Sequence, residues 1–180
     1  MKIFLILVAL LPLGVAYFRL DSAIDPIKML YSTTGIGSIV LLLLSLFPSF
    51  CKRICHINQL RYRKTLGLLS FLYALLHVSV FIVLDSECDF VSIFEKSLKK
   101  PFIYIGLIAF MIMLLMALTS TKRSFARFSK YHKAVYLALV LALVHSFLAQ
   151  KVAGVFEYSI IAVGTLLLAE RMWTWTKNHE

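Results

Sequence analysis

The order of apolar and polar positions divides the chain into six long apolar runs separated by short polar segments. The runs cover residues 3–18, 30–50, 66–84, 102–120, 134–149 and 155–172. Most approach the roughly 20 residues that a helix needs to cross about 30 Å of hydrocarbon. Because lipid offers no partner to an unpaired backbone N–H or C=O, each run is predicted to be a helix. The pattern predicts an all-α, polytopic membrane helix bundle with about six transmembrane helices.

Composition supports this class. Hydrophobic residues make up 61% of the chain and its mean hydropathy is +0.87, well outside the range of soluble domains. At 180 residues we expect a single domain over 1–180. The first run, with Lys2 before it and Gly14-Val15-Ala16 near its end, has features of a signal peptide. Since no polar mature region follows, we expect an uncleaved first span.

The net charge of +10 is concentrated in alternate loops. Segments 51–64 and 122–133 each carry five Lys or Arg residues and no acid, whereas 85–100 carries four acids and three lysines. The positive-inside rule then places both basic segments and both termini in the cytoplasm, with 19–29, 85–100 and 150–154 outside. Because the basic residues lie in alternate loops, we expect them to face membrane lipid and do not expect them to bind nucleic acid.

The three cysteines do not form a disulfide framework. Cys51, Cys55 and His56 resemble a covalent haem attachment site, but one residue too many separates the cysteines. The segment is also predicted to be cytoplasmic. We interpret these cysteines as small interfacial residues.

Two histidines, His77 and His145, lie inside apolar runs. An ionisable group in hydrocarbon is costly, so each is a functional candidate. Counted from Thr65 and His132, they lie about 18 Å and about 20 Å deep at ~1.5 Å per residue. Two imidazoles at matching depth on parallel helices can supply both axial ligands of a b-type haem. Hydrogen bonding between helices is the alternative role for each.

His132 precedes His145 by thirteen residues, which suits a second cofactor stacked through the membrane. On an ideal helix the two side chains would lie ~140° apart, so tilt or curvature is needed. Alone, His132 between Tyr131 and Lys133 is typical of a solvated helix end. The partner positions, thirteen and fourteen residues before His77, are Lys64 and Arg63, neither a usual haem ligand. His56 is an outside candidate.

Several segments resemble the MsrQ (YedZ) group of ferric-reductase-like membrane proteins. The matching motifs run in order along nearly the whole chain: Asp25-Pro26 with Thr34-Gly35, Arg63 through Gly67 and Tyr73 to His77, Lys100-Pro101 through Gly106 to Thr119-Ser120, and His132 to His145. Two departures occur. Phe47-Pro48-Ser49-Phe50 stands where the group has Thr-Pro-Leu-Arg, and the tryptophan usual before the fifth-helix histidine is absent.

The resemblance implies a haem b subunit, with one or two haems, in a system that repairs oxidised methionine in periplasmic proteins. Electrons would come from the quinone pool or a cytoplasmic flavin reductase. They would pass to a periplasmic molybdopterin reductase of the MsrP kind across the bacterial inner membrane. FMN is associated with the group. By residue match His77, His132 and His145 inherit the haem-iron ligand role, and no residue is catalytic.

Arg63, Lys64 and the 122–133 segment are where an anionic phosphate could dock. Two other functions stay open: a ferric reductase membrane domain with another acceptor, and a small metal transporter or assembly protein. We expect inverted repeats and broken helices in many transporters, and neither is evident in this sequence.

Overall fold

The computed structural model describes residues 2–54, 56, 59–150 and 154–177, and within them it contains helices and no strands. The α-helices are α1 (Lys2–Arg19), α2 (Pro26–Ile54), α3 (Arg63–Ser79), α4 (Phe90–Lys99), α5 (Pro101–Leu118), α6 (Lys122–Phe128), α7 (Val135–Ala149) and α8 (Val155–Lys177). Short 3₁₀ segments η1 (Leu20–Ser22), η2 (Leu60–Tyr62) and η4 (Ser129–Ala134) and a π-helical segment η3 (Val80–Asp85) join them.

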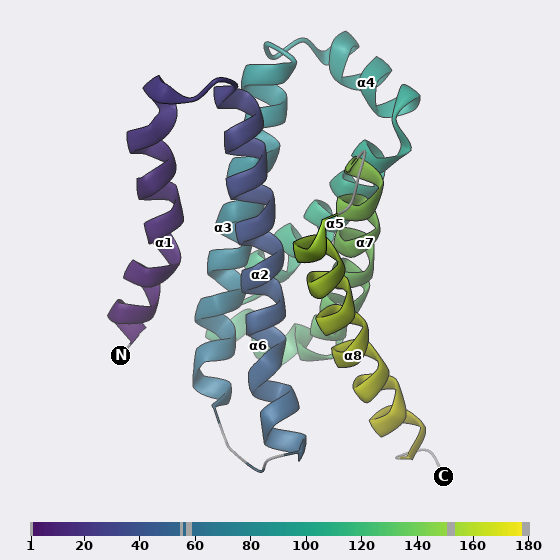
Figure 1. Ribbon diagram of the computed structural model, residues 1–180. Helices are drawn as coiled ribbons and strands as arrows, with labels where there is room; N and C mark the ends of the chain where they lie inside the picture. Colours follow the sequence, from purple (N-terminus) through teal and green to yellow (C-terminus); the bar gives the residue numbers. More distant parts are fainter. Residues whose placement is uncertain (1, 55, 57–58, 151–153, 178–180) are drawn as a thin grey trace.

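The long helices form an upright bundle whose connections alternate between its two ends (Figure 1). The start of α1, the α2–α3 connection and the end of α8 share one end, whereas the α1–α2 turn and α4 lie at the other. The first of these ends carries the basic segments and is called here the basic end. This arrangement agrees with loops that alternate in charge, and the assignment of the basic end to the cytoplasm remains a prediction.

In the part of the chain that the structure describes, five helical stretches are long and apolar enough to cross a membrane: Ile3–Ser22, Pro26–Ile54, Leu60–Asp85, Pro101–Leu118 and Arg123–Ala149. They correspond to the first five predicted spans. The sixth predicted span forms α8, a helix of 23 residues. Its apolar stretch is bounded by Glu157 on one side and by Glu170 and Arg171 on the other, which makes α8 less apolar than the five. The all-α, polytopic prediction is confirmed, and a crossing by α8 stays a prediction.

The core forms where α2, α3 and α7 meet. Its buried side chains come from five helices: Ile39, Leu42, Leu43 and Leu46 of α2, Ala74 of α3, Met113 of α5, Val135, Ala138, Leu139 and Leu143 of α7, and Leu167 of α8. A second cluster around Tyr73 lies between α2 and α3 on the side where α1 packs through Leu5, Ile6, Ala9 and Leu13. The Tyr73 hydroxyl donates to the Ala9 carbonyl at 2.5 Å. Helix α1, the first span, therefore packs on the outside of the bundle against α2 and α3.

An ion pair fastens α8 to α2 near the basic end. The Arg53 guanidinium donates through two nitrogens to the Glu170 carboxylate, with Nε 2.6 Å from Oε1. Only 24% of the Arg53 side chain and 12% of the Glu170 side chain are exposed. Parallel bonds of this kind fix geometry as well as charge, so α8 is held in one register.

We predict that Glu170→Ala lowers the free energy of unfolding by about 3 kcal/mol, because it leaves the Arg53 cation buried without its carboxylate. Glu95→Ala is the matched control, since its pair with Lys99 is well exposed and such pairs contribute about 0.5 kcal/mol or less. Denaturation of the detergent-purified variants measures both. Arg53→Met combined with Glu170→Leu should recover most of the loss. Equal effects of the two Glu→Ala changes would contradict the structural role of the pair.

Candidate functional site

His77 on α3 and His145 on α7 face each other across the bundle. Their ring centroids are 6.0 Å apart and the ring planes are perpendicular, with an interplanar angle of 90°. Both helices run away from the basic end, so matching depth along each brings the rings together. His77 and His145, which were singled out from the sequence because they lie at matching depth, are therefore neighbours in the fold.

The orientation of the His77 ring is fixed by α2. Its Nδ1 lies 3.2 Å from the hydroxyl oxygen of Thr34, which is almost fully buried. That hydroxyl has a single proton, and it donates to the Leu30 carbonyl at 2.6 Å. The Thr34 oxygen is thus an acceptor toward His77, so Nδ1 carries the ring proton and the lone pair of Nε2 is free. The Tyr31 ring adds an edge-on contact with a centroid distance of 5.4 Å.

The His145 ring is fixed in the same way by α5. Its Nδ1 lies 2.6 Å from the backbone carbonyl oxygen of Phe102. A carbonyl can only accept, so Nδ1 is again the protonated nitrogen and Nε2 keeps its lone pair. Gly106, one helical turn after Phe102, leaves room for this approach. A Cβ at Gly106 would lie 2.6 Å from His145 Nδ1.

Gly35 plays the corresponding part beside His77, because a Cβ there would lie 3.0 Å from Cε1 of that ring. Each imidazole therefore has one glycine and one hydrogen-bond acceptor on a neighbouring helix. Within the described ranges, no group of three or more His, Cys, Asp or Glu residues is placed to hold a metal ion. The facing pair can supply two nitrogen ligands.

A cavity of about 590 Å³ opens nearer the basic end, between α2, α3, α5 and the η4–α7 segment. Three residues singled out from the sequence line it: Arg63, Lys64 and His132. Arg53, Lys133 and Arg171 line it as well, so the wall carries five permanent cations. Among the described residues that line it, there is no Asp or Glu. The five cations attract a ligand that carries negative charge.

His132 lies in the 3₁₀ segment η4 rather than on the helix that carries His145. The expected ~140° separation assumed one continuous α-helix and does not apply, because a 3₁₀ segment has about three residues per turn. His132 Nε2 lies 3.1 Å from the Thr119 hydroxyl, and the Phe125 ring contacts the imidazole edge-on at 4.8 Å. The histidine is partly buried and faces the cavity wall.

The other cationic side chains of the cavity have individual contacts. Arg63 donates from Nη1 to the Ser49 hydroxyl at 3.1 Å. The Arg171 guanidinium lies over the Tyr136 ring, 5.5 Å from its centroid. Lys133 belongs to the 122–133 segment that the sequence already indicated as a docking place for an anionic phosphate, whereas nothing in the sequence indicated this for Arg53 and Arg171. These cations come together because α8 packs against α2 and α7. The apolar pattern of a single helix does not predict which other helix it packs against.

Two residues named from the sequence, Tyr73 of the third-span motif and His56, lie away from the facing histidines and from the cavity. Tyr73 is fully buried and points toward α1, where it serves packing. His56 is exposed in the α2–α3 connection, with a left-handed φ of 58°, and it does not line the cavity. Cys55 of the rejected attachment motif lies outside the described residues, as do 151–153 of the predicted outer loop and His179.

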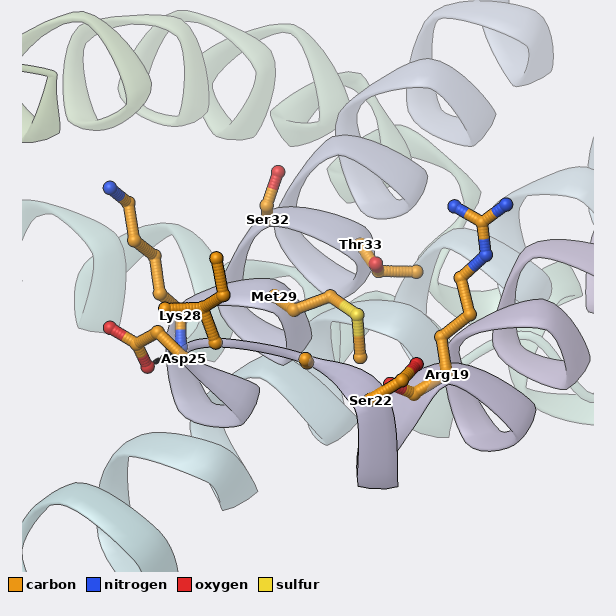
Figure 2. A pocket seen from close by; sticks show the side chains of 9 residues that line it. Arg19, Ser22, Asp25, Lys28, Met29, Ser32 and Thr33 are labelled. Atoms are coloured by element: carbon orange, nitrogen blue, oxygen red, sulfur yellow. Dashed lines mark hydrogen bonds between the residues drawn. The ribbon is translucent and has the colours of Figure 1, made fainter.

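A second hollow, of about 610 Å³, lies at the opposite end between the α1–α2 turn and the start of α2. Figure 2 shows Met29 in the middle of this hollow, with Arg19 on one side and Asp25 and Lys28 on the other. Asp25 accepts from the Lys28 backbone N–H at 2.9 Å and so caps α2. The hollow is open and of mixed charge, in contrast to the cationic cavity.

The chain is similar in sequence to known membrane proteins. A family model described as ferric reductase like transmembrane component matches residues 34–143. The chain is 32% identical over 167 residues to the protein-methionine-sulfoxide reductase heme-binding subunit MsrQ of Agrobacterium fabrum, an alignment that covers 88% of this chain and 78% of that relative. It is 35% identical over 131 residues to MsrQ of Brucella ovis and of Brucella canis.

The Brucella alignments cover 71% of this chain and 60% of each relative, so the chain spans less than two thirds of their length. No solved structure matches. Family membership rests on the ferric reductase match over more than half of the chain and on the identity to MsrQ over most of it. The chain belongs to the ferric-reductase-like transmembrane family, within the group of MsrQ heme-binding subunits, a family of membrane electron-transfer proteins.

Proposed function

We propose that this chain is a transmembrane electron-transfer subunit that holds haem b between His77 and His145. It passes electrons from a donor at the basic end to an acceptor at the opposite end. The observation that carries the proposal is the facing pair of imidazoles, each with Nδ1 hydrogen-bonded and Nε2 free. The names of the relatives, which describe a heme-binding subunit, support it.

The residues present fit the group. An iron between two imidazole nitrogens needs two bonds of about 2 Å plus half of each ring, or about 6 Å between ring centroids. The observed separation is 6.0 Å. A porphyrin would supply four nitrogen ligands to its iron, so the protein would need to supply only the two that this pair offers. When bound, haem supplies a one-electron carrier.

The protein's own part in this function is to orient and to protect. Thr34 and the Phe102 carbonyl hold the two rings in one tautomer and one orientation, as outer hydrogen bonds to metal-bound histidines do. With both His77 and His145 bound to it, haem iron would have no place for oxygen or substrate. The apolar helices exclude water from the pair. Electron conduction, without bond-making chemistry in this chain, is the role that these features support.

We propose further that the basic-end cavity holds a second anionic cofactor, either a second haem ligated by His132 or FMN. Haem propionates and a flavin phosphate share the negative charge that the five cations of the wall would bind. Arg63 and Lys64, which line the cavity together with His132, would contact that charge. The volume of about 590 Å³ suits a planar cofactor of this size class.

The proposed donor is quinol or a cytoplasmic flavin reductase, and the proposed acceptor is a periplasmic molybdopterin methionine-sulfoxide reductase of the MsrP kind. The charge of the loops supports a basic end in the cytoplasm of a bacterial inner membrane. The printed names of the relatives support a role in protein-methionine-sulfoxide reduction. Reoxidation of the reduced chain by such a reductase and methionine sulfoxide tests this acceptor.

We predict that His77→Ala and His145→Ala each remove nearly all of a low-spin b-type signal, because each deletes one axial ligand. His132→Ala should leave the haem of the facing pair in place. A dithionite-reduced minus oxidised spectrum, with haem quantified per chain, measures the effect. His56→Ala is the control, since His56 is exposed in a loop. Full haem content in both the His77 and the His145 variants would refute the proposed ligation.

Thr34→Val should weaken haem retention by roughly 10- to 100-fold, because the substitution keeps the shape of the side chain but removes the acceptor for His77 Nδ1–H. Transfer of haem to an excess of a haem-scavenging protein measures the release rate. Thr165→Val is the matched control, because that hydroxyl bonds only within α8. Release from the Thr34 variant at the unmodified rate would argue against the hydrogen bond as a support of the ligand.

Arg63→Ala should weaken the cofactor of the basic-end cavity by about 10- to 100-fold, the effect expected when one charge-assisted hydrogen bond is lost. Counting haem per chain and measuring released flavin distinguish the two candidate cofactors. Arg61→Ala is the control, because Arg61 lies over the Tyr62 ring and does not line the cavity. If the Arg63 variant retains every cofactor of the unmodified protein, the cavity is not the second site.

A further inference from the structure

The short helix α4 carries a stripe of large apolar side chains that no other part of the described chain covers. Phe90, Val91, Phe94 and Leu98 are between 66% and 84% exposed. At about 100° per residue these four positions fall within one arc of roughly 100°. An exposed stripe this regular on a helix indicates a surface that is buried against something outside the chain.

The remaining surface of α4 has two different parts. Ser92, Ile93, Lys96 and Ser97 are partly buried and face the bundle. Lys96 Nζ fastens this side by donating to the Asp85 carbonyl at 2.5 Å and to its carboxylate at 3.2 Å. Glu95 and Lys99 form the other part, an exposed charged strip with an ion pair of 2.9 Å. The helix therefore presents an apolar sector and a charged sector next to each other, both outward.

The position of α4 determines what these two sectors meet. It joins the end of η3 to the start of α5 at the end of the bundle opposite the basic loops, and it is inclined to the long helices (Figure 1). The Asp89 carboxylate caps its start by accepting from the Val91 and Ser92 backbone N–H groups, at 3.1 Å each. Both neighbouring segments belong to candidate membrane spans, so α4 lies at the level where hydrocarbon gives way to headgroups.

The apolar stripe is also continuous with surfaces that face lipid. Val83 and Leu84 on η3, just before α4, and Tyr104 on α5, just after it, are exposed apolar residues of spans. Positive charge does not draw α4 to anionic lipid, because segment 85–100 contains four acidic residues and three lysines. Apolar burial alone favours the stripe entering the acyl boundary, as in interfacial helices that lie in the membrane plane.

We propose that α4 is an interfacial helix of the lipid leaflet at this end of the bundle. Its stripe of Phe90, Val91, Phe94 and Leu98 is immersed in the acyl–headgroup boundary, and its Glu95–Lys99 strip faces water. The lipid-held helix, tied through Lys96 to Asp85, anchors the outer end of the span that carries His77. The proposal is independent of any cofactor.

Site-directed nitroxide labelling of the full chain in neutral phosphatidylcholine bilayers tests the proposal. Cys51, Cys55 and Cys88 are replaced by Ser, and single cysteines are introduced by Phe94→Cys, Leu98→Cys, Glu95→Cys and Lys99→Cys. Phe94 and Glu95 form a matched pair, adjacent in sequence and about 100° apart on the helix. Ile108→Cys, on an exposed position of α5, is the lipid reference. Collision with oxygen reports lipid, and collision with a polar nickel chelate reports water.

We expect the ratio of oxygen to nickel accessibility at Phe94 and Leu98 to lie below that at Ile108, which is deeper in the hydrocarbon, and to exceed the ratio at Glu95 and Lys99 several-fold. The ratio should stay the same when anionic lipid is added. Nickel accessibility at Phe94 equal to that at Glu95 would overturn the proposal. So would an immobilised label that neither reagent reaches, which would indicate a covering protein surface. If one labelled variant fails to fold, Phe90→Cys provides a further position on the stripe.

Discussion

The close approach of α2 and α3 is the constraint on which the rest of the structure depends. In hydrocarbon, a serine hydroxyl must find its partner inside the bundle. The Ser38 hydroxyl donates to the Ser70 carbonyl at 3.2 Å, and the Ser70 hydroxyl donates to the Ser38 carbonyl at 2.8 Å. Small residues allow this contact. Because Thr34 lies one turn from Ser38, and His77 two turns from Ser70, the register fixed by the serines brings Thr34 to the His77 ring.

The α5–α7 pair repeats the geometry of the α2–α3 pair with different chemistry. Thr34 and His77 are 43 residues apart, and so are Phe102 and His145. Both pairs descend to the basic end on their first helix and return on their second, so the two histidines ascend in parallel. One imidazole bonds to a side-chain hydroxyl and the other to a backbone carbonyl. Two different hydrogen-bond acceptors thus bind the same nitrogen, Nδ1, and leave Nε2 of each ring without this bond.

The sequence was sufficient to predict the helix bundle. It was also sufficient to predict that His77 and His145 lie at the same depth, because the rise per residue of a helix converts residue number into depth. It was also sufficient to single out Lys64, which precedes His77 by the same thirteen residues that separate His132 from His145. It could not identify the Phe102 carbonyl, since a backbone acceptor carries no side-chain signal. It missed the 3₁₀ geometry around His132. It also missed Arg171, whose place in the cavity wall depends on how α8 packs against α2.

The charges of the basic-end cavity connect the fold to its proposed ligand. Five cations line one hollow, and among the described residues only Arg53 has a carboxylate in contact, that of Glu170. Like charges around a shared space of low polarity repel one another and oppose the compact state. An anionic group bound there offsets this repulsion, and by mass action it stabilises the folded chain that binds it. Retention of the proposed cofactor and stability of the bundle therefore depend on the same arginines and lysines. Helix α8 contributes to both, because its Glu170 carboxylate holds Arg53 in place.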